Sequence, residues 1–263
     1  MTVGALRLGR WQDVLADVTP DTVIVDAPYS AATHRGHDAA QRHDGAGTLV
    51  DGQELTNALT YPGWDEADVS EFVASWSGRT KGWIVTITDH VLAPIWTAHL
   101  RAAGRYVFAP LPLVETGSRV RLQGDGPSSW TCWIVVARPR TEAFVRWGTL
   151  PGAYVGKREA KTVMGGKPLG LMRSIVRDYS RPGDLICDPC AGGATTLIAA
   201  LTEGRRTVGA EALPAQYAKA LAVMRGGYTP TLDLTGEDRE WKNETLDGGT
   251  CAGGTKGSSD GER

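Results

Sequence analysis

The sequence predicts an α/β protein built on a mostly parallel, doubly wound sheet with irregular inserts. Short apolar runs rich in β-branched residues alternate with segments that carry apolar residues at helical spacing, as in strands and helices that pack in layers. Two of the apolar runs end in an acidic residue followed by a turn containing proline, at Asp26 and Asp188. The second turn is rich in glycine and runs into an apolar helical stretch. These features favour a sheet that binds a ligand at its strand ends.

The elements follow in order along the chain. Strands are expected at residues 5–8, 22–25, 83–88, 106–114, 131–137, 184–187 and 206–210. The fourth of these is expected to be broken by Pro110 and Pro112. A helical turn is expected through Val14 and Leu15, and a helix over residues 197–201. Four more helices are predicted from apolar faces, formed by Val69, Phe72, Val73 and Trp76; by Leu92, Ile95, Trp96 and His99; by Leu169, Met172, Ile175, Val176 and Tyr179; and by Tyr217, Ala220, Leu221 and Met224.

Three segments lack such periodicity. Residues 30–64 are rich in Gly, Ala, Asp and His and are interpreted as a long mobile loop, which in a compact domain usually has a function. Residues 138–166 are expected to be irregular. Residues 226–263 are polar and rich in glycine, and we expect a disordered tail there. The folded domain is therefore predicted to span residues 1–225.

Composition limits the class of protein. The formal net charge is −2, so the chain as a whole has no basic signature. Between Arg119 and Lys161, however, eight basic residues face three acidic ones. That local excess fits contact with a phosphate backbone, and it fits a solvated surface equally well. The sequence has no signal peptide and no apolar stretch of membrane-spanning length, which favours a cytoplasmic protein.

Cysteine and histidine do not predict a metal site. Cys132 and Cys187 lie in apolar runs and are expected to be inert core residues. A single Cys-x-x-Cys pair has no second pair to complete a zinc site. The loop histidines have no cysteine or carboxylate at ligand spacing; they are His34, His37 and His43.

The first turn, Asp26-Ala27-Pro28-Tyr29, brings together a carboxylate, backbone carbonyls and an aromatic ring. Hydrogen-bond acceptors and a stacking surface are what chemistry on the amino group of a flipped base requires. An ordinary strand-to-turn connection is the alternative interpretation.

The second turn runs from Asp188 to Thr196 and leads into a helix. Glycine lets the backbone approach a ligand, and a helix N-terminus offers free N–H groups. Glu211 follows 23 residues after Asp188, at the end of the next predicted strand, where a carboxylate can accept hydrogen bonds from ribose hydroxyls. The Gly-x-Gly-x-x-Gly pattern is absent, so a nicotinamide-dependent oxidoreductase fits less well. A plain Gly-rich connection remains the alternative.

In this order the two turns resemble those of the amino-DNA methyltransferases, the N6-adenine and N4-cytosine family. Its catalytic signature is (Asp/Asn/Ser)-Pro-Pro-Tyr, and its cofactor signature is typically Asp-Pro-Phe-x-Gly-x-Gly-Thr-Thr. The catalytic turn comes first here, as in the β-type permutation, and Lys167-Pro168 precedes the cofactor strand as in that group. Residues 30–35 and 124–127 are similar to small phage and prophage members. Three positions depart from the signatures, namely Ala27, Cys190 and Ala194.

The resemblance implies a Rossmann-like, S-adenosylmethionine-dependent methyltransferase fold and methyl transfer to an exocyclic amine of DNA, as in restriction–modification systems. Asp in the first catalytic position favours N6 of adenine over N4 of cytosine, and a catalytically inactive DNA-binding protein is a further alternative. A homodimer is left open. The implied catalytic residues are Asp26, Ala27, Pro28 and Tyr29. The implied cofactor residues are Lys167, Asp188, Pro189, Cys190, Ala191, Gly192, Gly193, Thr195, Thr196 and Glu211. The implied DNA contacts are Ser30, His34, Arg35, Arg119 and Arg121, within a loop at 30–64 and a DNA-contacting insert at 116–166.

Overall fold

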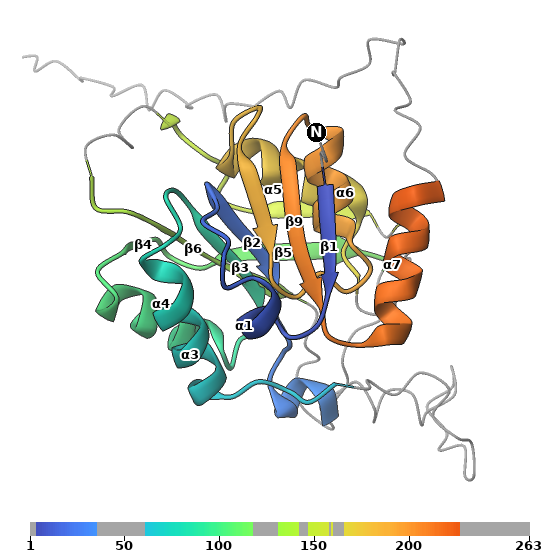
Figure 1. The fold of residues 1–263 in the computed structure, drawn as a ribbon. Helices are drawn as coiled ribbons and strands as arrows, with labels where there is room; N and C mark the ends of the chain where they lie inside the picture. Colours follow the sequence, from blue (N-terminus) through green and yellow to red (C-terminus); the bar gives the residue numbers. More distant parts are fainter. Residues whose placement is uncertain are drawn as a thin grey trace, which may run out of the picture. The chain divides into compact units, whose positions relative to one another are not determined.

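A computed structural model describes residues 4–35, 61–117, 131–141, 147–157, 159 and 166–226. These residues form a single sheet with helices packed against it (Figure 1). The strands are β1 (Gly4–Leu8), β2 (Thr22–Asp26), β3 (Ile84–Thr88), β4 (Tyr106–Val107), β5 (Leu111–Thr116), β6 (Cys132–Arg138), β7 (Tyr154–Lys157), β8 (Leu185–Asp188) and β9 (Arg206–Glu211). The helices are α1 (Trp11–Val14), α3 (Glu66–Ser77), α4 (Ala93–Ala102), α5 (Leu169–Tyr179), α6 (Thr195–Thr202) and α7 (Pro214–Gly226).

The sheet is mostly parallel, as the sequence predicts. Its strand order is β1-β9-β8-β2-β3-β6-β5-β7, and β4 pairs with β6. All neighbours from β1 to β3 are parallel. Beyond β3, strand β6 runs antiparallel to both β3 and β5, while β5 and β7 are parallel. The predicted α/β fold class is therefore confirmed.

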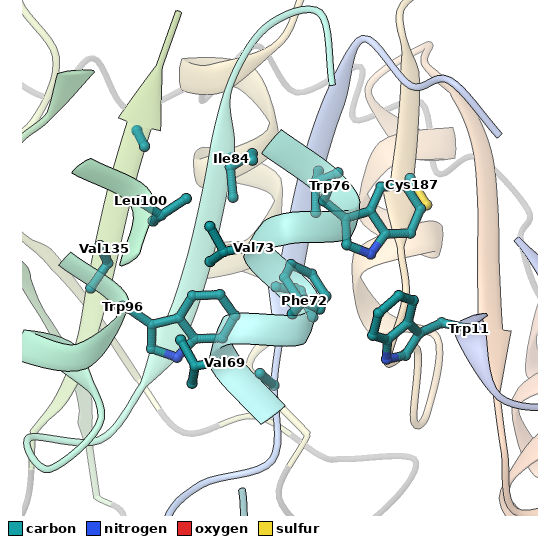
Figure 2. Packing of buried hydrophobic residues seen from close by; sticks show 14 of the residues in the cluster. Trp11, Val69, Phe72, Val73, Trp76, Ile84, Trp96, Leu100, Val135 and Cys187 are labelled. Carbon is teal, nitrogen blue, oxygen red and sulfur yellow. The ribbon is translucent and has the colours of Figure 1, made fainter. Parts of the chain in front are cut away.

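One face of the sheet is covered by α1, α3 and α4 through a cluster of aromatic side chains (Figure 2). The ring of Phe72 lies 5.4 Å from that of Trp11 and 5.2 Å from that of Trp96. All four residues that predict α3 are buried. Asp65 caps this helix by accepting hydrogen bonds from the N–H groups of Ala67 and Asp68. Packing and cap together fix where the chain enters α3, directly after Trp64.

The other face is covered by α5 and α6. Ile175 and Val176 of α5 are fully buried against apolar residues of the sheet, and Ala199 and Ala200 of α6 belong to the same cluster. Helix α7 completes the layer because Ala220 packs with Leu197 of α6. The alternation of strands and helices thus places its helices on both faces, the arrangement of a doubly wound sheet.

Three sequence expectations need correction. Residues 138–166 are not wholly irregular, because they include β7. This strand is short and contains Gly156, so the sequence shows no alternation of apolar and polar residues there. The predicted strand at 106–114 is interrupted at residues 108–110, as expected at Pro110, but Pro112 lies inside β5 and does not break it. Cys132 is half-buried rather than a core residue, because it begins β6 beside the first turn. The structure does not describe His37, His43, Arg119, Arg121, most of the 30–64 loop or the tail beyond residue 226.

Candidate active site

The two turns singled out in the sequence lie side by side. Strands β2 and β8 are parallel neighbours, with Val23 opposite Cys187, so Asp26 and Asp188 end adjacent strands at the same edge of the sheet. From there the chain continues into helices on opposite faces of the sheet, which is where open α/β sheets bind ligands. A cleft of about 700 Å³ opens at this edge and is lined by both turns.

The carboxylate of Asp26 is engaged through both of its oxygens. Lys167 donates a hydrogen bond from Nζ to Oδ2 at 2.6 Å, and the hydroxyl of Tyr29 donates to Oδ1 at 3.2 Å. The same hydroxyl lies 3.2 Å from Sγ of Cys132, at the start of β6. The half-exposed turn therefore presents a carboxylate acceptor and an aromatic ring, and the hydroxyl of that ring is hydrogen-bonded to the carboxylate.

Lys167, which the resemblance implies as a cofactor residue, lines the same cleft as the Gly-rich turn. Its side chain, 8% exposed, pairs with the carboxylate of Asp26. Burial by itself lowers the pKa of Lys167, but the negative charge of Asp26 outweighs this effect and raises the pKa above its ordinary value. The residue is therefore held as a cation within the cleft.

Asp89, which the sequence analysis did not single out, holds the chain that follows the first turn. It follows β3 directly, and its Oδ2 accepts hydrogen bonds from the Ser30 amide, the Ser30 hydroxyl and the Thr33 hydroxyl. Its Oδ1 caps α4 by accepting from the N–H groups of Val91 and Leu92. Burial tends to raise the pKa of Asp89, but these hydrogen bonds prevail and lower it. Its position at the end of a buried strand was the signal that could have identified it.

Asp89 therefore fixes the chain as it leaves the first turn, Asp26–Tyr29. Ser30, an implied DNA contact, is 5% exposed and its hydroxyl is bonded to this carboxylate. His34 is half-buried, with its ring 5.4 Å from that of Tyr61, and Arg35 is exposed.

The glycine-rich turn is folded around two carboxylates. Asp188 accepts a hydrogen bond from the N–H of Cys190 at 3.1 Å. Glu211 accepts from the N–H of Gly192 at 2.9 Å and from that of Leu213 at 2.7 Å, so it ties the turn to the end of β9. Ala194 occupies the left-handed region, with φ of 63°, a conformation that glycine adopts without strain. An alanine therefore stands here in a conformation that favours glycine, at the position where the methyltransferase signature has glycine.

Residues lining the cleft carry more negative than positive charge. The described lining includes two basic residues, Arg10 and Lys167, and five acidic ones, namely Asp26, Asp68, Glu71, Asp188 and Glu211. Burial raises the pKa of Asp188 to about 7, with a smaller contribution from neighbouring carboxylates. Burial also raises the pKa of Glu211 and of the Cys190 thiol. A cationic ligand bound in the cleft would reduce the electrostatic repulsion between these carboxylates.

Residues 61–64, which precede α3, also line the cleft. The sequence analysis did not predict this contribution. Tyr61 and Trp64 both line the cleft, and the N–H of Trp64 donates to the carbonyl of Tyr29 at 3.0 Å. Gly63 passes so close that a Cβ there would lie 2.6 Å from the backbone nitrogen of Ala31. Burial raises the pKa of Tyr61 to about 12, so its hydroxyl stays protonated. Residues 61–64 thereby pack against the first turn and the residues that follow it.

The arrangement suits chemistry between two ligands in one cleft. Asp26 can accept hydrogen bonds from an amino group beside the ring of Tyr29, while the Gly-rich turn and Glu211 can hold a nucleoside next to it. In the described part of the chain, no three His, Cys, Asp or Glu residues are grouped as metal ligands. None of its helices has the length and apolar character needed to cross a membrane.

Comparison with known proteins agrees with this geometry. Residues 140–222 match the family model described as DNA methylase, of the N6/N4 type. "Putative methylase YubD" of Escherichia coli (strain K12) is 36% identical over 67 residues, which are 26% of this chain and 28% of that protein. The match thus spans little more than a quarter of the relative.

Solved structures share the fold over nearly their whole length. The complex of M1.HpyAVI with SAM has a TM-score of 0.60 at 15% identity, covering 83% of this chain and 97% of that one. TTHA0409 of Thermus thermophilus, complexed with S-adenosyl-L-methionine, has a TM-score of 0.57 at 20% identity, covering 86% and 96%. The cytosine-N4-specific PvuII DNA methyltransferase has a TM-score of 0.52 at 13% identity, covering 84% and 86%. Residues 140–222 are thus similar to the N6/N4 DNA methylases, and the described part of the chain has the fold of these solved structures.

Proposed function

We propose that this protein is a DNA methyltransferase that uses S-adenosylmethionine to methylate an exocyclic amine, N6 of adenine. The observation that carries the proposal is the pairing of the two turns in one cleft: Asp26 at the end of β2 and Pro28 after it line the cleft together with the Gly-rich turn and Glu211. The fold and the DNA methylase match over residues 140–222 support it.

The cleft residues fit the cofactor. S-adenosylmethionine carries a sulfonium and an ammonium group, and the acidic lining is complementary to them. Glu211 would accept hydrogen bonds from the ribose hydroxyls, and residues 188–196 would surround the remainder of the ligand. When bound, the cofactor supplies the methyl group as an electrophile.

The chain's own residues would act on the target amine. That nitrogen is a poor nucleophile because its lone pair is delocalised into the base. Hydrogen bonds from its N–H groups to the Asp26 carboxylate and the Ala27 carbonyl would favour a pyramidal nitrogen with its lone pair aimed at the methyl group. Stacking of the flipped base on Tyr29 would contribute about 1–3 kcal/mol. Alignment of the two reactants would supply much of the remaining acceleration.

Mass spectrometry of digested DNA tests the proposal. Purified protein is incubated with S-adenosylmethionine and unmethylated DNA of mixed sequence, and the nucleosides are then quantified. N6-methyladenine is expected. N4-methylcytosine would establish the second candidate, which the shared fold with a cytosine-N4-specific enzyme favours. Binding without methylation of DNA or RNA would support an inactive DNA-binding protein instead.

Cofactor affinity should depend on pH through Asp188. Its pKa of about 7 means that the carboxyl group is partly protonated at neutral pH, whereas a cationic ligand favours the carboxylate. Binding should therefore tighten as pH rises through about 7 and weaken roughly tenfold between pH 8 and pH 6. Calorimetry in buffers of different ionisation enthalpy should show proton release below pH 7. Asp188→Asn should remove this component, and an unchanged pH profile in that variant would contradict it.

DNA affinity should fall steeply with salt. Arg119 and Arg121 belong to the locally basic stretch of the sequence, and each phosphate contact that is lost reduces the slope of log K against log salt by about one. The double variant Arg119→Ala/Arg121→Ala is expected to bind more weakly and with a shallower slope. The matched control is Lys219→Ala/Arg225→Ala, which removes two charges from α7. Equal losses in both variants would show that net charge alone matters.

A further inference from the structure

Lys167 reaches the catalytic turn from a different element. It precedes α5, whose N-cap is Pro168, and its Nζ lies 2.6 Å from Asp26 Oδ2. The same nitrogen lies 5.1 Å from the centroid of the Tyr29 ring. A residue before proline is restricted to extended backbone conformations, and burial together with the contact to Asp26 then holds the Lys167 side chain.

The ammonium group is suited to holding a carboxylate and unsuited to accepting a proton. It has three donors and no lone pair while protonated. Its raised pKa keeps it in that form despite burial. Any contribution of Lys167 to the reaction must therefore come from charge and geometry.

We infer that Lys167 is a positioning residue that holds Asp26 by Oδ2, so that Oδ1, on the Tyr29 side, accepts the hydrogen bond from the target amine. The inference rests on the proposed function. It assigns Lys167 to the methyl-accepting half of the site instead of the cofactor half. An aspartate at a strand end can otherwise rotate about both side-chain torsions, and a misplacement of about 1 Å is enough to cost about 10²-fold in rate.

Single substitutions separate these roles. Lys167→Met removes the charge and keeps much of the length, Lys167→Arg keeps the charge, and Lys219→Met makes the same change on the exposed surface of α7. Melting temperature, the dissociation constant for S-adenosylmethionine and the single-turnover rate with saturating DNA and cofactor are measured for each. We expect Lys167→Met to lose about 10²-fold in rate with cofactor affinity within about threefold of wild type. Lys167→Arg should recover part of the rate, and Lys219→Met should match wild type.

A double-mutant cycle with Asp26→Asn tests the pairing itself. An amide offers no carboxylate for Lys167 to hold, so Lys167→Met should cost at least about fivefold less in the Asp26→Asn background than in wild type. If Lys167→Met does not fold, Lys167→Gln replaces it in the cycle.

Two results would overturn the inference. One is an equal cost of Lys167→Met in both backgrounds; the other is a weakened cofactor affinity with a normal rate at saturation. A wild-type protein that methylates nothing would instead refute the proposed function. In that case the same double-mutant cycle is measured on the free energy of unfolding. If the losses of stability caused by Lys167→Met and Asp26→Asn simply add in the double variant, the pairing is refuted independently of activity.

Discussion

Replacing Asp26 by alanine is expected to lower the rate of methyl transfer to DNA by about 10³-fold while S-adenosylmethionine still binds within a few-fold of wild type. The carboxylate lies at the end of β2, beside Tyr29 and Lys167, whereas Glu211 and the Gly-rich turn form the cofactor side of the cleft. The loss should therefore fall on the transition state and leave cofactor affinity almost intact. Single-turnover kinetics and calorimetry measure the two quantities separately.

The alanine variant leaves Lys167 as a buried cation without its carboxylate, which destabilises the fold. Asp26→Asn is the companion variant, because it keeps an acceptor oxygen at the same place and should retain part of the activity. A folded Asp26→Ala protein with normal turnover on DNA would end the mechanism proposed here.

Tyr29 variants separate the ring from its hydroxyl. Tyr29→Phe keeps the stacking surface and loses only the 3.2 Å hydrogen bond to Asp26, so it should retain much of the activity. Tyr29→Ala removes the ring and should weaken productive capture of the flipped base, by about 1–3 kcal/mol. Equal activities of the two variants would show that the ring does not stack on the base.

The sequence predicted the central parallel strands well, because β2, β3 and β8 are buried on both faces. Val23, Ile24 and Val25 of β2 are fully buried, and such strands appear in the sequence as continuous β-branched runs. Strand β7 was missed for the opposite reason: it is four residues long, and two of those residues are exposed. Short strands of that kind carry no period that a sequence can show.

The candidate site was predictable only where its residues belong to one turn or end successive strands. Asp26 and Tyr29 share one turn, and Asp188 and Glu211 end successive strands, so spacing was enough to find them. Lys167 and Asp89 join the site through contacts between residues far apart in the chain. Neither residue belongs to a local pattern that specifies its partner, and so three-dimensional packing was needed to place them.

Replacing Glu211 by alanine should have the largest effect on cofactor affinity. Its carboxylate accepts hydrogen bonds from the N–H groups of Gly192 and Leu213 and is almost fully buried, so it shapes the Gly-rich turn as well as offering acceptors to a ribose. Both contributions are lost together in the variant. We expect S-adenosylmethionine to bind more weakly by about 1.5–3 kcal/mol, which is roughly 10- to 150-fold in the dissociation constant.

A glutamine at this position distinguishes the two contributions. Glu211→Gln keeps one acceptor oxygen, but its NH₂ group faces an N–H donor of either Gly192 or Leu213 and cannot accept from it. Its affinity should therefore fall between those of wild type and Glu211→Ala. Glu203→Ala controls for a general loss of negative charge. It removes a carboxylate that pairs with Arg173 and Arg177 away from the cleft, and this variant should bind S-adenosylmethionine as wild type does. If a folded Glu211→Ala protein binds the cofactor as tightly as wild type does, the ribose does not lie at the end of β9.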